Sequence, residues 1–175
     1  MGLLDLRNEI MADLDSGMAR EEAFNRRVSA HPQDASKVAF AIASIPKQEM
    51  RTRYLRLNSV LFLILVGVSI MGFLQELPID FQQSTIFIFL RIGLPLVFSY
   101  FVYQFHGGIY RLLGFWCLFD LLEWFLLAKF VTLFGLLKLI LLILAIILSF
   151  YIAFKIFPNL RLLGPKTDAQ GRFLL

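Results

Sequence analysis

The chain has 175 residues, of which 58% are hydrophobic and 17% are charged, and it carries a net charge of +4. Ordinary soluble domains are roughly 45–50% apolar and about 25% charged, and a soluble domain this small could not bury so much apolar surface. The composition therefore excludes a soluble enzyme, a disordered chain and a disulfide scaffold. It predicts an all-α integral membrane protein, namely a four-helix transmembrane bundle with a short N-terminal cytoplasmic helical head.

The head comprises residues 1–45, in which apolar residues recur at helical spacing among charged ones. A first helix is predicted to end at Ser16-Gly17, a second to run over residues 19–30, and a third to begin at an Asp34 N-cap. Five bases against seven acids give the head a net charge of −2, and we expect these charged side chains to form a solvated face. A segment this short has little stability alone. We therefore expect it to pack weakly on itself, on the membrane face or on a partner.

A basic segment, residues 46–57, follows the head and has a net charge of +3. Pro46 suits the first turn of a helix, and that helix is expected to continue into the membrane. Anionic headgroups attract juxtamembrane Lys and Arg by about 1 kcal/mol each. The expected lipid-headgroup contacts are Lys47, Arg51, Arg53 and Arg56.

The membrane region, residues 46–158, contains four predicted spans, because about 20 apolar residues cross the hydrocarbon core. They are residues 57–75, 84–105, 109–130 and 132–157, and a polar cytoplasmic tail follows at 159–175. A polar turn at residues 76–80 separates the first two spans. Only Lys129 and Thr132 mark the join between the last two, so three spans remain an alternative to four.

The distribution of Lys and Arg predicts the orientation of the spans. With four spans both chain ends lie on one side, and positive residues stay cytoplasmic. One side would collect Lys47, Arg51, Arg53, Arg56, Arg111, Lys155, Arg161, Lys166 and Arg172, against Lys129 alone on the other. The sequence therefore predicts a multi-pass protein of the cell inner (plasma) membrane with both termini in the cytoplasm.

Four ionisable residues lie inside the predicted spans: Arg91, Asp120, Glu123 and Lys138. Charged groups inside the membrane are costly and are candidates for function. At about 1.5 Å rise per residue, Arg91, Glu123 and Lys138 fall at similar depths in the outer half of the bundle, and Asp120 lies nearer the midplane. We therefore predict an intramembrane charge cluster in which Arg91 and Lys138 pair with the two acids.

Helical spacing supports this cluster, because Asp120 and Glu123 are three residues apart and share a helix face. On the second span Ser84, Arg91, Pro95 and Ser99 form one stripe. The fourth span carries a seam of mostly small residues that lets helices approach closely. This seam consists of Gly135, Lys138, Leu142, Ala145 and Ser149.

Three interpretations of the charged residues remain open. The opposite charges fix the helix register without further function, or they form a proton or ion pathway. In the third interpretation Arg91 or Lys138 faces lipid and extends its charge to the interface.

The sequence carries no motif of a known catalytic or metal site. A single cysteine, Cys117, and two distant histidines, His31 and His106, make a structural zinc site improbable. There is no catalytic serine, metalloprotease or nucleotide-binding motif, so no catalytic residue, metal ligand or cofactor is predicted. We expect His106 to be a solvated loop residue and Trp116 and Trp124 to be packing or interfacial residues.

The function predicted from these features is that of a non-enzymatic subunit, anchor or regulator that acts through its cytoplasmic head. A transporter or oligomeric channel that uses the charge cluster is the alternative. A membrane enzyme with Asp120 and Glu123 as an acid pair ranks third. The expected partners are anionic lipid headgroups and a protein at the cytoplasmic face, with homo-oligomers left open and nucleic acid not expected.

Overall fold

The computed structural model describes residues 3–30, 32–75, 85–126, 133–162 and 164–175, with residues 3, 4, 30, 75 and 85–91 described by their backbone alone. The regular secondary structure of the described part is helical, apart from two isolated β-bridges near the C-terminus. Its elements are α1 (Leu3–Asp15), α2 (Arg20–Ala30), a 3-10 helix η1 (Pro32–Asp34), α3 (Ala35–Ala43), α4 (Gln48–Gln75), α5 (Thr85–Tyr103), α6 (Gly107–Leu126) and α7 (Leu133–Ile156).

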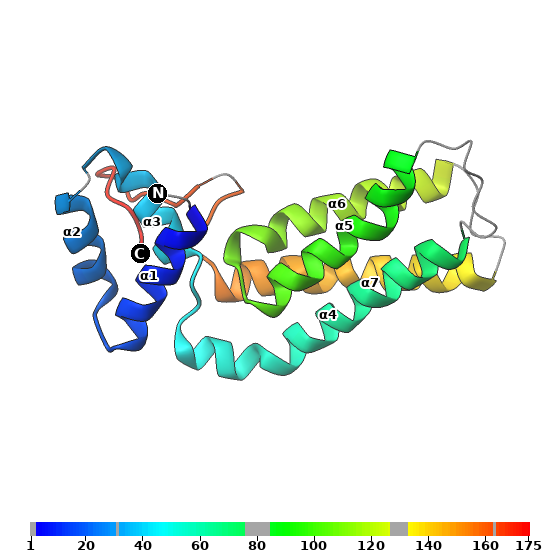
Figure 1. Ribbon diagram of the computed structural model, residues 1–175, viewed down its shortest axis with the longest axis horizontal. Coiled ribbons are helices and arrows are strands. Elements are labelled where there is room, and N and C mark those ends of the chain that lie inside the picture. Colours follow the sequence, from blue (N-terminus) through cyan, green and yellow to red (C-terminus); the bar gives the residue numbers. More distant parts are fainter. Residues whose placement is uncertain (1–2, 31, 76–84, 127–132, 163) are drawn as a thin grey trace.

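The long helices α4–α7 lie side by side and extend in one direction from a cluster of the short helices (Figure 1). The main contacts join α4 to α5 and to α7, and α6 to α7, whereas α5 contacts α6 only slightly. Among the described residues, α4 and α7 are long and apolar enough to cross a membrane. Helices α6 and α7 are separate helices that pack on each other. The number of spans, three or four, stays a prediction. The polar turn and the join at Lys129 and Thr132 lie outside the described residues.

Helix α4 runs without a break from Gln48 in the basic segment through the first predicted span, as expected, although Pro46 and Lys47 precede the helix. The seam predicted on the last span is confirmed, because all five of its residues are buried on α7. On α6, which packs on α7, Gly114 allows close approach of the two helices. A Cβ at this position would lie 2.8 Å from the Phe150 ring and 2.9 Å from Ser149 Oγ. Small side chains therefore set the spacing between α6 and α7.

Helix α5 contains a proline, Pro95, which has no N–H to donate to the preceding turn. The hydroxyl of Ser69 on α4 donates a hydrogen bond to the carbonyl oxygen of Ile92, three residues before the proline, at 2.5 Å. Neighbouring hydroxyl groups commonly satisfy the backbone near such a proline in apolar helices. Pro95 and Ser99 are both buried, which fits the inward stripe predicted for them.

The head is built from α1, α2 and α3, and these helices begin and end close to the predicted positions. Their shared core contains Leu6 and Ile10 of α1, Ala23 of α2, and Val38 and Ile42 of α3. Gly17, with a φ of 94°, occupies the break between the first two helices. Asp34 stands at the predicted N-cap, but its carboxylate accepts a hydrogen bond from Lys37 Nζ at 2.7 Å and caps no backbone N–H of α3.

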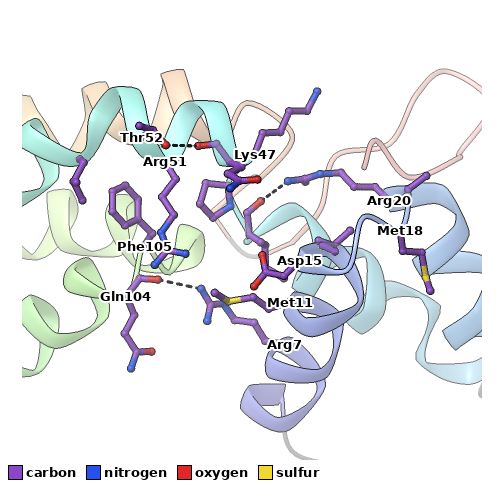
Figure 2. A pocket seen from close by; sticks show the side chains of 16 residues that line it. Arg7, Met11, Asp15, Met18, Arg20, Lys47, Arg51, Thr52, Gln104 and Phe105 are labelled. Atoms are coloured by element: carbon purple, nitrogen blue, oxygen red, sulfur yellow. Dashed lines mark hydrogen bonds between the residues drawn. The ribbon is translucent and has the colours of Figure 1, made fainter.

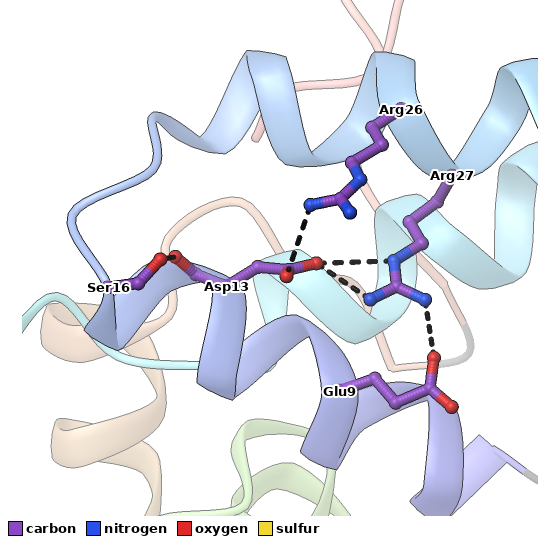
Figure 3. A network of polar contacts seen from close by, with 5 residues as sticks. All are labelled: Glu9, Asp13, Ser16, Arg26 and Arg27. Atoms are coloured by element: carbon purple, nitrogen blue, oxygen red, sulfur yellow. Dashed lines mark hydrogen bonds and ion pairs between the residues drawn. The ribbon is translucent and has the colours of Figure 1, made fainter.

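Ion pairs also link α1 to α2. Arg27 of α2 donates to Asp13 at 2.7 Å and to Glu9, and Arg26 lies 3.6 Å from Asp13 (Figure 3). The hydrogen bond to Asp13 is the main cause that raises the pKa of Arg27. The solvated charged face predicted for the head is therefore partly an ordered network.

The tail, residues 159–175, folds back onto the head (Figure 1). Leu175 packs against the head core, and the rings of Phe173 and Phe24 meet edge to face with centroids 6.0 Å apart. Asn159 Nδ2 donates to the carbonyl oxygen of Leu175 at 3.1 Å, which closes the tail into a loop. The two ends of the chain therefore build one head together.

Helix α3 joins the head to the long helices. Val38, Ala41 and Ile42 face the head core, whereas Ala43 belongs to the core of the long helices and Phe40 packs against it. One nine-residue helix therefore contributes to both cores, which explains why its sequence is almost entirely apolar.

Candidate functional site

The structure brings together two of the four charged residues predicted inside the spans. Lys138 Nζ of α7 lies 3.2 Å from Asp120 Oδ2 of α6, and the two side chains are only 3% and 8% exposed. The ammonium group also lies 4.8 Å from the centroid of the Trp124 ring, one turn along α6. A buried charge is tolerated only when it is paired. Here the carboxylate of Asp120 and the face of the Trp124 ring both stabilise the ammonium group of Lys138.

The other two residues of the predicted cluster are less fully defined. Glu123 is half-buried, one turn after Asp120 on α6. Arg91 belongs to α5, but its side chain lies outside the described residues. The pairing of Arg91 with either acid therefore stays a prediction.

A second polar group inside the long helices escaped the sequence analysis. Asn58 of α4 donates a hydrogen bond to the carbonyl oxygen of Val102 at 2.8 Å and accepts one from the hydroxyl of Tyr110 at 2.6 Å. The residues belong to α4, α5 and α6, and all three are buried. An asparagine near the start of an otherwise apolar span was the available signal, because buried amides need partners.

The four predicted headgroup contacts lie at or just before the start of α4. Lys47, Arg51, Arg53 and Arg56 are all exposed, and they stand where the polar head gives way to the apolar helices. Arg51 and Arg53 also lie over aromatic rings, with their guanidinium carbons 5.8 Å from the centroid of Phe105 and 5.9 Å from that of Tyr54.

The turn between α5 and α6 is buried beneath the head, so the prediction that His106 is a solvated loop residue is wrong. His106 is 9% exposed, and its Nδ1 has no hydrogen-bond partner among the described residues. The N–H of Gly107 donates to the carbonyl oxygen of Ser44 at 3.0 Å, which ties the turn to the end of α3. Burial, together with the charge of Arg7, lowers the pKa of His106 to about 4, so the imidazole is neutral at pH 7.

Two arginines of the head likewise depart from the predicted solvated face. Arg7 is 3% exposed and donates to the carbonyl oxygen of Gln104 at 3.2 Å. Arg20 donates to the carbonyl oxygens of Ile42 and Ile45 at 3.1 and 2.7 Å, and so satisfies the end of α3. These contacts, which join residues distant along the chain, determine the burial of the two arginines. Helical periodicity does not predict contacts of this kind.

The head adjoins several concave sites, two of which bear on function. The first, which we call the junction cavity, has a volume of about 690 Å³ and lies between the head, the start of α4 and the α5–α6 turn (Figure 2). The second, the head groove, has a volume of about 1110 Å³ and lies between α2 and the tail. Its lining includes Glu21, Asn25, Val28, Arg172 and Leu174.

The described part of the chain contains no group of three or more His, Cys, Asp or Glu side chains that could hold a metal ion. Comparison of the chain with protein-family models, with curated proteins and with solved structures finds no match.

Proposed function

We propose that the chain is a multi-pass protein of the cell inner membrane whose cytoplasmic head docks a partner protein, so that it acts as a non-enzymatic subunit, anchor or regulator. In this proposal α4–α7 form a four-span bundle, and both termini lie in the cytoplasm. The observation that carries it is the division of the molecule into two surfaces of opposite character.

The apolar surface supports the membrane placement. Among the described residues, every exposed large apolar side chain belongs to α4–α7 except Leu162 and Leu174. Only 39% of the most apolar stretch of α4 and 28% of that of α7 is buried, whereas the core helix of a soluble protein would be mostly buried. Apolar surface on this scale marks a membrane or protein interface.

The position of the charges supports the orientation. The exposed basic residues at the start of α4 adjoin the head, where they would meet the headgroups of the cytoplasmic leaflet. The head contains both α1 and the tail, so one aqueous compartment would hold both ends of the chain.

The head groove supports the docking role. It combines apolar residues, such as Val28 and Leu174, with charges of both signs, including Glu21 and Arg172. Protein interfaces typically surround an apolar centre with a polar rim. We therefore place the partner protein, or a second copy of this chain, in this groove.

Neighbouring glutamates of α2 provide a matched test of docking. Glu21 lines the head groove, whereas Glu22 is exposed outside that lining. We expect a tagged full-length chain in mild detergent to retain a stoichiometric partner that Glu21→Arg loses and Glu22→Arg keeps. Recovery of the chain alone, or equal loss in both variants, would contradict docking at this groove. Light scattering measures the mass of the purified complex and so shows whether the partner is a second copy of this chain.

A transporter or oligomeric channel is the second candidate, and the buried Asp120–Lys138 pair favours it. Proton or ion flux into liposomes that is lost with Asp120→Asn and reduced with Glu123→Gln would support this candidate. Liposomes that show no flux above the protein-free background would leave the pair with a structural role.

A further inference from the structure

The junction cavity has more basic than acidic side chains in its described lining. Four bases line it, namely Arg7, Arg20, Lys47 and Arg51, against the single acid Asp15. Within the described residues no carboxylate forms an ion pair with any of these bases. Arg20 donates to the carbonyl oxygens of Ile42 and Ile45. The Lys47 side chain extends away from Arg7 and Arg51 (Figure 2).

Arg7 and Arg51 approach this space from different parts of the molecule. Arg7 comes from α1 and Arg51 from the first turn of α4, and their guanidinium groups lie close together beside Gln104 and Phe105 (Figure 2). Arg7 is 3% exposed, and its Nε is buried without a hydrogen-bond partner among the described residues. Burial, and then the charge of Arg51, lowers the pKa of Arg7, because two cations repel each other in a partly desolvated space.

A bound anion beside these groups would offset their repulsion, since it would neutralise the paired guanidinium groups of Arg7 and Arg51. Arginine is the side chain best suited to phosphate, because its planar donors match two oxygens at once. We propose that the junction cavity binds a phosphate group through Arg7 and Arg51, and that the bound group holds the head against the long helices.

The surroundings favour an anionic phospholipid as the source of this phosphate. The cavity shares Arg7, Arg51, Leu55 and Phe105 with an adjoining hollow that Tyr103 also lines. Leu55 is 52% and Tyr103 is 70% exposed on the apolar surface of α4 and α5. A headgroup in the cavity would therefore place its acyl chains on that surface. This choice of source rests on the proposed membrane placement, whereas phosphate recognition itself does not.

Thermal unfolding of the full-length chain in neutral detergent, followed by tryptophan fluorescence, tests the proposal. Phosphatidylglycerol is compared with phosphatidylcholine in the same micelles, and pyrophosphate with chloride at equal ionic strength. Arg51→Gln is the main variant because the side chain is exposed and its loss leaves the Arg7–Gln104 contact in place. Arg161→Gln is the control, since it removes the same charge from an exposed residue of the tail, outside the cavity lining.

We expect phosphatidylglycerol to stabilise the wild type and Arg161→Gln, and Arg51→Gln to weaken its binding about tenfold, as for one lost charge-assisted hydrogen-bond donor. Stabilisation by pyrophosphate with the same Arg51 dependence supports phosphate recognition from a soluble source. Stabilisation by no phosphate compound, or equal weakening in both variants, overturns the proposal. A separate experiment measures whether the chain sediments with membranes. If it does not, the proposed membrane placement is wrong, and the pyrophosphate comparison still tests phosphate binding.

Discussion

At the scale of single residues, the Asp120–Lys138 pair carries the clearest energetic consequence. Both side chains are almost fully buried, so removal of either one leaves an uncompensated charge in an apolar environment. Breaking such a pair typically costs about 3–5 kcal/mol, whereas replacing both partners by apolar groups is often neutral.

We therefore expect Lys138→Met to destabilise the long helices strongly and Asp120→Leu/Lys138→Met to recover most of the loss. Unfolding in detergent, with helix content followed by circular dichroism, measures both variants. Equal destabilisation in the single and double variants would show that the ion pair contributes beyond charge balance, for example through the contact with Trp124.

The neutral state of His106 predicts a dependence of stability on pH. An unfolded histidine has a pKa of about 6.5, and in the folded chain burial lowers the pKa of His106 to about 4. Between pH 6.5 and pH 4 the imidazole binds a proton in the unfolded state but not in the folded state. The free energy of unfolding therefore has its full value above pH 6.5 and falls as the pH drops toward 4. The loss should reach roughly 3 kcal/mol at the acid end.

Melting temperatures measured from pH 7.5 to 4 check this expectation. His106→Gln should flatten the profile over this range, and the slope should survive in His31→Gln, which removes the only other histidine. A profile that keeps its slope in His106→Gln would assign the pH dependence to other groups.

At the scale of the elements, close contact between α6 and α7 depends on a missing side chain. A Cβ at Gly114 would press on both Phe150 and Ser149 of α7, and overpacking of this kind typically costs about 1–3 kcal/mol. Gly114→Ala should therefore lower the melting temperature of the detergent-solubilised chain. Gly164→Ala is the matched control, because nothing lies within 4 Å of its Cβ position. Equal melting temperatures for the two variants would contradict a role of Gly114 in helix spacing.

At the scale of the whole molecule, the head depends on a segment far from it in sequence. The tail contributes Phe173 and Leu175 to the head. Deletion of residues 164–175 should therefore expose the head core and speed proteolysis of α1–α3, while the fragment that contains α4–α7 stays resistant. Limited proteolysis with mass spectrometry distinguishes the two regions. Unchanged cleavage of α1–α3 would show that the head is stable without its tail.

Helical periodicity was sufficient to predict most of the elements. It located α1–α3, the unbroken α4 and the buried seam of α7, because these features depend on residues within one helix. It also placed Asp120 on a buried face. Depth and helical spacing predicted a cluster of two bases and two acids without assigning individual pairs, and the observed contact of Asp120 with Lys138 lies within that cluster.

The sequence by itself determined where apolar stretches begin and end, which faces are apolar and how the charges are distributed, since each of these is a local property of the chain. Only the tertiary structure decided that Arg7 and His106 are buried, that Asn58 meets Tyr110 and that the tail completes the head. Those contacts join residues distant along the chain. Their burial follows from how the head packs on the α5–α6 turn, which no local pattern specifies.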